Sequence, residues 1–149
     1  MLARDIMTRD PEVVTPDETV ARAATIMREL NVGIVPVVND RSHMKLEGVI
    51  TDRDIAIRCV AERHHRDCRV AEHMTTDHLD TARTDTPVED VLSTMEHDRV
   101  RRIPVVDERE RLVGIIAQAD LARRVGPAEP RKIEMLLEHI SEPTTGRAD

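Results

Sequence analysis

One short segment in the first half of the chain carries side chains suited to binding chemistry. It reads Gly48-Val49-Ile50-Thr51-Asp52-Arg53-Asp54, in which an apolar strand ends and a helix begins at once. At such a helix start Thr51 lies among free backbone N–H groups that suit a phosphate, and Arg53 adds a charge that pairs with one. Asp54 offers two acceptor oxygens for a pair of sugar hydroxyls, and Gly48 lets another group approach the strand closely. These residues predict a site for a ribose phosphate.

The same residues have a purely structural interpretation. Thr51 and Asp54 have the spacing of a capping box, in which each side chain accepts a hydrogen bond from the other residue's backbone N–H. Such a cap stabilises a helix by about 1 kcal/mol without any ligand. Both interpretations remain open at this point.

Much of the chain occurs twice, which favours the binding interpretation. Met27 and Met95 are 68 residues apart, and so are Pro36 and Pro104, each of which lies in an apolar run that ends in Pro-Val-Val. A repeat of this length is a complete supersecondary unit, so two similar α/β units are expected to pack face to face. The cleft between them is the natural place for a ligand.

Each copy begins with an amphipathic helix. In the first copy Val20, Ala23, Ala24 and Met27 recur at helical spacing, and Asp17 is predicted to cap the helix. The second copy repeats this helical pattern, with Asp85 predicted as the cap and Pro87 in the first turn. Its apolar positions are Val88, Val91, Leu92 and Met95.

After each of these helices the pattern changes to paired β-strands followed by another helix. The predicted strands are 34–38 and 46–50 in the first copy and 103–106 and 112–116 in the second, and the predicted helices are 52–62 and 118–125. The order strand, helix, strand, strand, helix in each copy predicts an α/β chain of the α+β type with a pseudo-twofold axis. The expected boundaries are 2–62 and 71–126 for the repeats, 63–70 for a linker, and 127–149 for a C-terminal helix and tail.

With these elements in place, the chain resembles a pair of cystathionine-beta-synthase (CBS) domains, known as a Bateman module, over approximately residues 2–125. The resemblance rests on the Asp-Ile-Met-Thr leader, the Pro-Val-Val runs and the segment from Gly48 to Asp54. It implies that the cleft binds an adenosine-containing ligand, that Thr8, Val13, Val32 and Gly33 line the base pocket, and that the module forms a homodimer. It also implies that Arg101 and Arg102 face the phosphates, although these arginines equally fit a solvated basic face balanced by nearby acids.

The second copy departs from the binding pattern. It reads Gly114-Ile115-Ile116-Ala117-Gln118-Ala119-Asp120, so Asp120 is kept while alanines replace the hydroxyl and the arginine. Because two phosphate contacts are lost, the sequence predicts one competent site at Thr51 and Asp54 and a weak or vacant site around Asp120.

The C-terminal segment shows one apolar stripe. Ile133, Leu136, Leu137 and Ile140 follow Pro130 at helical spacing, which predicts a short helix that packs on the module or on a partner chain. The residues from 141 to 149 carry little apolar content and are expected to fray.

Composition narrows the class of protein. A net charge of −7 argues against nucleic-acid binding, and the absence of Phe, Trp and Tyr excludes aromatic stacking platforms. With no signal peptide and no apolar span, a cytoplasmic protein without membrane contact is expected. Cys59 and Cys68 should remain thiols. The group Cys59, His64, His65, Cys68 and His73 fits no usual ligand spacing, so a polar linker with no metal is predicted.

The leading functional prediction is a sensor without catalytic residues. It would bind an adenosyl ligand, AMP or ATP before NAD or S-adenosylmethionine, require no other cofactor, and pass its shape change to an effector protein. The alternative is a ligand-free structural or interaction protein of the stress-response type. An enzyme is a third class, but no nucleophile and base pair supports it.

Overall fold

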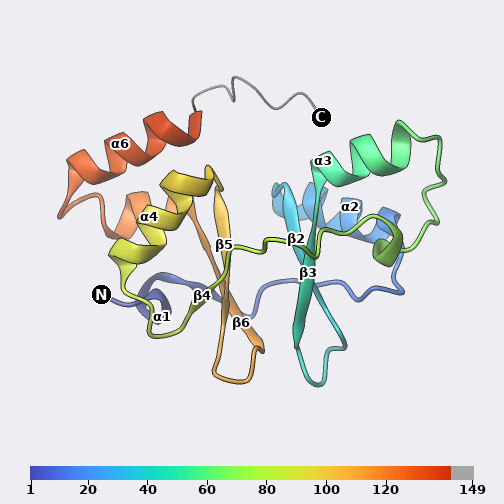
Figure 1. Ribbon diagram of the computed structural model, residues 1–149, viewed down its shortest axis with the longest axis horizontal. Coiled ribbons are helices and arrows are strands. Elements are labelled where there is room, and N and C mark those ends of the chain that lie inside the picture. Colours follow the sequence, from blue (N-terminus) through green and yellow to red (C-terminus); the bar gives the residue numbers. More distant parts are fainter. Residues whose placement is uncertain (142–149) are drawn as a thin grey trace.

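The computed structural model describes residues 1–141, which form a mixed α+β fold of two similar halves (Figure 1). The first half contains α2 (Val20–Leu30), β2 (Ile34–Val38), β3 (Leu46–Thr51) and α3 (Asp52–Asp54), which continues as a π-helix (Ile55–Val60). The second half contains α4 (Val88–Asp98), β5 (Arg102–Val106), β6 (Leu112–Ala117) and α5 (Gln118–Arg124). The remaining elements are α1 (Ala3–Ile6), β1 (Thr8–Arg9), a 3-10 turn (Val70–Glu72), β4 (Ala82–Arg83) and α6 (Pro130–Ser141).

The two predicted hairpins are confirmed, and they match each other in register. Pro36 pairs with Val49 in the antiparallel β2–β3 hairpin, and Pro104 pairs with Ile115 in the antiparallel β5–β6 hairpin. Each hairpin has an irregularity at the same place, between Val37 and Val38 and between Val105 and Val106. The duplication therefore extends to backbone detail.

The leader of the first copy, residues 5–8, packs on the second copy. Thr8 in β1 pairs with Ile115 in β6, which gives a four-stranded sheet in the order β1-β6-β5-β4, while β2 and β3 form a sheet of their own. Ala3 and Ile6 of α1 are fully buried in the core of the second half. This exchange joins the halves through main-chain hydrogen bonds as well as apolar contacts.

The leader of the second copy, residues 72–75, crosses in the opposite direction. Thr75 and Val49 exchange two backbone hydrogen bonds of 2.8 and 3.0 Å, and Met74 packs against the first core. A Cβ atom at Gly48 would overlap the carbonyl oxygen of Thr75, and one at Gly114 would overlap the Met7 side chain. The close approach that Gly48 was expected to allow is therefore made by the other copy's leader.

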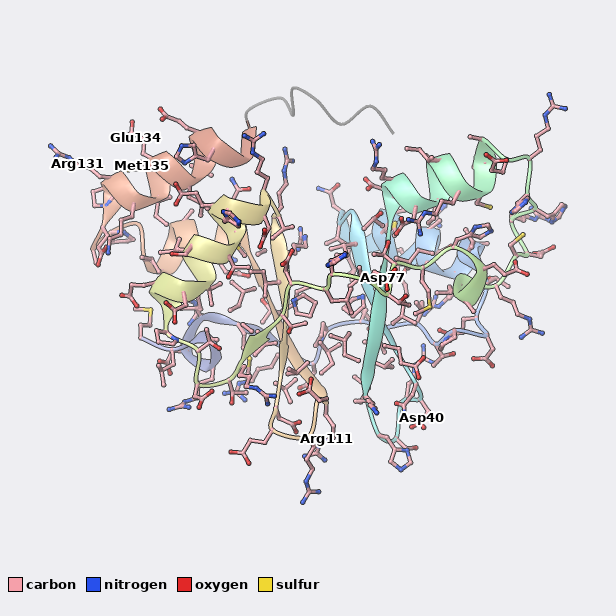
Figure 2. All side chains as sticks on the ribbon, viewed as in Figure 1. Asp40, Asp77, Arg111, Arg131, Glu134 and Met135 are labelled. Carbon is pink, nitrogen blue, oxygen red and sulfur yellow. The ribbon has the colours of Figure 1, made fainter. Side chains whose placement is uncertain are left out.

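A small apolar seam joins the two hairpin turns. Val13, Val38 and Leu112 form a buried cluster there, and the Leu112 N–H donates to the Met44 carbonyl at 2.8 Å. Figure 2 labels Asp40 and Arg111, which mark the two turns at the same end of the molecule. Val13, expected in a base pocket, instead packs in this seam.

The predicted helix caps need correction. Thr19, not Asp17, accepts the N–H of Arg22 at 3.2 Å. The first N–H groups of α2, from Val20 and Ala21, donate to carbonyls of the segment joining the copies. Asp17 instead accepts from the Thr15 hydroxyl at 2.6 Å, which lowers its carboxyl pKa. In the second copy Pro87, rather than Asp85, occupies the N-cap position.

The core faces of the two long helices follow the predicted period with one exception. All four predicted core positions of α4 are buried. In α2 the predicted core position Ala24 is exposed, and Ile26 is buried in its place. The helix after β3 also differs, because residues 55–60 take a π-helical form that no residue pattern indicated.

The C-terminal helix α6 packs on α4 and α5 (Figure 1). Ile133 and Leu136 are buried in the second core, while Leu137 is 38% exposed. The expected fraying beyond the helix concerns residues 142–149, which lie outside the described residues, and the Ile140 side chain is not described. No helix within residues 1–141 combines the length and apolar character needed to cross a membrane.

Candidate functional site

The exit of β3 forms the reciprocal cap that its residue spacing predicts. The Thr51 hydroxyl accepts from the Asp54 N–H at 3.0 Å, and the Asp54 carboxylate accepts from the Thr51 N–H at 3.0 Å. Asp54 is only 8% exposed. The structural interpretation of this pair is therefore realised in the fold.

The Asp54 carboxylate has further partners from the second leader and its own helix. The Thr75 hydroxyl lies 3.2 Å from both carboxylate oxygens, and the Arg58 Nε lies 3.7 Å from one of them. Asp54 thus ties the first copy to the leader of the second. A sugar hydroxyl at this carboxylate would have to share it with Thr75.

The second copy presents its carboxylate differently. One oxygen of Asp120 accepts from the Ala117 N–H at 2.8 Å, and the other pairs with the Arg123 guanidinium at 2.7 Å. Ala117 has no hydroxyl, so the reciprocal half of the cap is missing. The Arg123 side chain is 75% exposed and can turn away into solvent, which leaves one oxygen of Asp120 available to a ligand.

A cavity of about 470 Å3 lies beside Asp120, between the two halves. This volume is within the range of small-molecule sites. Its wall is mostly aliphatic, with Val32, Ile34 and Pro36 from the first copy facing Ile115 from the second. It could enclose a flat heterocycle between aliphatic side chains. The polar groups at its edge are Thr8, Asp10, Glu12, Arg102, Asp120 and Arg123.

A second cavity, of about 1050 Å3, adjoins the first. Both are lined by Ile34, Arg102, Ala117 and Ala119, so the two spaces form one continuous cleft. The second cavity is strongly basic, because its lining includes one carboxylate, Asp52, and four guanidinium groups: Arg53, Arg99, Arg101 and Arg102. Such a surface attracts a phosphate tail.

The structure distributes the predicted site residues over this cleft in an unexpected way. Thr8 and Val32 line the aliphatic cavity together with Asp120, not with Asp54. Gly33, Thr51, Arg53 and Arg101 line the basic cavity, Arg102 lines both, and Asp54 lines neither. The physical cause is the exchange of leaders, since β1 carries Thr8 onto the strand that ends next to Asp120.

Sequence reasoning missed two features, one at Asp54 and one outside the residues that line the two cavities. Thr75 occupies the position in the second leader that Thr8 occupies in the first, so the repeat itself could have identified it. The second feature is a carboxyl pair: burial and the neighbouring Asp98 carboxylate raise the pKa of Asp80, while His78 acts in the opposite direction. No motif marks that pair.

Comparison with known proteins establishes the family. The CBS domain family model matches residues 3–60 and 70–126, so this chain belongs to the CBS domain family and carries a tandem pair. The chain is 39% identical over 119 residues to the CBS domain-containing protein YhcV of Bacillus subtilis, covering 80% of this chain and 81% of the relative. It is 37% identical over 123 residues to Hypoxic response protein 1 of Mycobacterium tuberculosis, and the match covers 83% of this chain and 84% of the relative.

Solved structures of CBS pairs share the fold. One is Hypoxic Response Protein I with two coordinated zinc ions, at a TM-score of 0.74 and 35% identity over 83% of this chain and 98% of that one. The CBS pair of MJ0100 with 5'-methylthioadenosine and S-adenosyl-L-methionine has a TM-score of 0.73 and 32% sequence identity, and the match covers 87% of this chain and 98% of that one. CBSX2 with AMP has a TM-score of 0.72 and 26% sequence identity, and the match covers 86% of this chain and 98% of that one.

A further relative is an enzyme that contains a similar module. The chain is 32% identical to inosine-5'-monophosphate dehydrogenase of Streptococcus pyogenes over 114 residues, which is only 22% of that protein. Its activity therefore says nothing about this chain.

Proposed function

We propose that this chain is a regulatory module that binds an adenine nucleotide in the cleft between its repeats. The observation that carries the proposal is the continuity of an aliphatic cavity beside Asp120 with a basic cavity lined by four arginines. The base lies against Val32 and Pro36, the ribose hydroxyls bond to Asp120, and the phosphates extend toward Arg101 and Arg102. The adenosyl ligands in the related MJ0100 and CBSX2 structures support this ligand class.

The charge of the basic cavity favours a nucleotide over other adenosyl compounds. S-adenosylmethionine carries a sulfonium cation, which the arginines would repel, whereas AMP and ATP bring the opposite charge. Thr51 and Arg53 line this cavity, which supports the phosphate-binding role that the sequence predicts for them. We therefore expect ATP and AMP to bind more tightly than adenosine, and S-adenosylmethionine to bind most weakly.

The proposal assigns the ribose to Asp120 rather than to Asp54. Asp54 is held by Thr51 and Thr75 and lines neither cavity, whereas Asp120 lines the aliphatic one. The sequence predicted the reverse ranking, because it judged the sites by how complete each motif is. Asp54 then serves mainly to fix the second leader on the first copy.

Titration calorimetry with AMP on a pair of variants tests this assignment. In Asp120→Asn the amide presents N–H groups where the carboxylate presented an acceptor, so AMP should bind more weakly by about 1.5–3 kcal/mol, or roughly 10- to 150-fold. The matched control is Asp54→Asn, which should change AMP affinity by less than about threefold. Weak binding in Asp54→Asn with unchanged binding in Asp120→Asn would restore the original ranking.

Signalling requires that the ligand bind one arrangement of the repeats better than another. The cleft lies between two halves that touch through exchanged leaders, so a ligand contacting both halves can bias their arrangement. We propose a second copy of this chain as one partner, since Ile57, Val60 and Met135 are each at least 46% exposed and lie on helices on one side of the molecule (Figure 1). Native mass spectrometry should then report a dimer.

The second candidate function is a ligand-free interaction module. It is favoured by the closure of Asp54 by Thr75, which leaves the more complete of the two motifs engaged within the protein. The calorimetry separates the two candidates. Absence of heat with AMP and ATP at millimolar concentration would support the interaction module and refute nucleotide binding.

A further inference from the structure

Outside the cleft, three metal-binding side chains converge where the first copy ends and the second leader begins. Cys59 lies on the π-helix, Cys68 lies on the segment after it, and His73 follows the 3-10 turn. One ligand atom from each lies within 4.8 Å of the other two. Cys59 and His73 are each 2% exposed, and Cys68 is half-buried. The sequence predicted a polar linker here, because the spacing along the chain does not reveal this convergence.

A fourth group stands next to the three. The Nδ1 atom of His64 lies 3.3 Å from the Nε2 atom of His73. Two imidazole nitrogens on one tetrahedral zinc ion, each about 2.0–2.1 Å from the metal, are about 3.3 Å apart. Sulfur and nitrogen ligands of the same ion are about 3.5 Å apart and two sulfurs about 3.8 Å. His64 is exposed, so its side chain has room to turn toward an ion held by the other three groups.

We propose that Cys59, Cys68 and His73, with His64 as the fourth ligand, bind one structural Zn2+ ion. Two thiolates and two imidazoles form a donor set that selects zinc over magnesium or calcium, and four protein ligands leave no open position for catalysis. The ion would replace two thiol protons, so binding releases protons and strengthens as the pH rises.

Without an ion, the surroundings of Cys59 favour its protonated thiol. Burial is the main cause that raises the pKa of the Cys59 thiol, and the adjacent Cys68 and the Glu72 carboxylate act in the same direction. The neighbouring His65 pairs with Asp67 at 3.2 Å. A divalent cation among these groups stabilises the thiolates that the protein alone disfavours.

The position of the site explains what the ion would do. The Cys68 carbonyl accepts the first N–H of α2, from Val20, at 2.8 Å. His73 is two residues before Thr75, which bonds to both Val49 and Asp54. Zinc would therefore tie the π-helix, the joining segment and the second leader together. This role does not depend on nucleotide binding.

Metal analysis of the untagged full chain tests the proposal. The protein is dialysed with zinc under reducing conditions and then against buffer, and its zinc is measured by mass spectrometry of the element. We expect one zinc ion per chain, and Cys68→Ser should weaken zinc binding more than about 100-fold. His43→Ala is the matched control, because His43 is exposed and pairs with Asp40 far from the cluster. It should bind zinc normally.

Cobalt substitution identifies the ligands directly. The Co2+-loaded protein should show thiolate-to-cobalt charge transfer and tetrahedral visible bands, and His64→Ala should alter those bands while Cys68→Ser removes the charge transfer. Circular dichroism of Cys68→Ser checks that the half-buried substitution leaves the fold intact. A wild-type chain without stoichiometric zinc, zinc binding unchanged in Cys68→Ser, or a Cys59–Cys68 disulfide under reducing conditions would overturn the proposal.

Discussion

Gly48→Ala is the substitution that most directly probes the exchange of leaders between the copies. Its new Cβ would overlap the Thr75 carbonyl oxygen and would lie 2.8 Å from the Met74 side chain. The carbonyl cannot move without lengthening the two hydrogen bonds between Thr75 and Val49. The leader must therefore shift away from β3 in this variant.

The size of the effect follows from these contacts. Overpacking a well-packed site costs about 1–3 kcal/mol, and each weakened backbone hydrogen bond adds up to about 1 kcal/mol. Alanine also lowers the conformational entropy of the unfolded chain, which stabilises the folded state by about 0.4–1 kcal/mol. We expect Gly48→Ala to lower the free energy of unfolding by about 1–4 kcal/mol, measured by urea denaturation.

Gly33→Ala provides the matched control. The three atoms nearest to its Cβ all belong to the Asp52 carboxylate, the closest at 3.0 Å, and Asp52 is an exposed side chain that can turn aside. Its free energy of unfolding should change by less than about 1 kcal/mol in either direction. Equal stability of Gly48→Ala and the wild type would show that the second leader does not lie against β3 in solution.

Two further predictions concern charge in the cleft and near it. Arg102→Ala should weaken AMP binding about 10-fold or more while leaving adenosine binding nearly unchanged, because only AMP carries the phosphate; Arg109→Ala, in an exposed turn, should leave both unchanged in calorimetry. Burial and Asp98 raise the pKa of Asp80, so keeping it ionised in the folded state lowers stability at neutral pH. Asp80→Asn should therefore increase the free energy of unfolding at pH 7, by less than about 1 kcal/mol because Asp80 is partly exposed. This gain should vanish below the ordinary Asp pKa of 3.8, where the wild-type carboxyl is protonated in both states, and a gain independent of pH would contradict the argument.

The repeated architecture could be predicted because it is written in local patterns. Helical spacing around Met27 and Met95 and the paired apolar runs around Pro36 and Pro104 depend only on neighbours in the sequence. The cap formed by Thr51 and Asp54 could be predicted for the same reason, because its two hydrogen bonds join residues that are only three positions apart.

The features that could not be predicted depend on contacts between residues far apart in the sequence. Thr8 pairs with Ile115, and no local pattern states that a leader belongs to the other copy. For this reason Thr8 and Val32, predicted to line the base pocket, lie beside Asp120 and not beside Asp54, and Gly48 lies against the leader of the second copy. Cys59 and His73 likewise meet only because the segment between them turns back on the π-helix.

The most direct measurement of the central claim is a crystal structure of this chain with AMP. We expect the base between the two repeats against Val32 and Pro36, a ribose hydroxyl about 3 Å from the Asp120 carboxylate, and the phosphate among the arginines of the basic cavity. AMP bound at Asp54 in place of the Thr75 hydroxyl, or an empty cleft at saturating AMP, would contradict it.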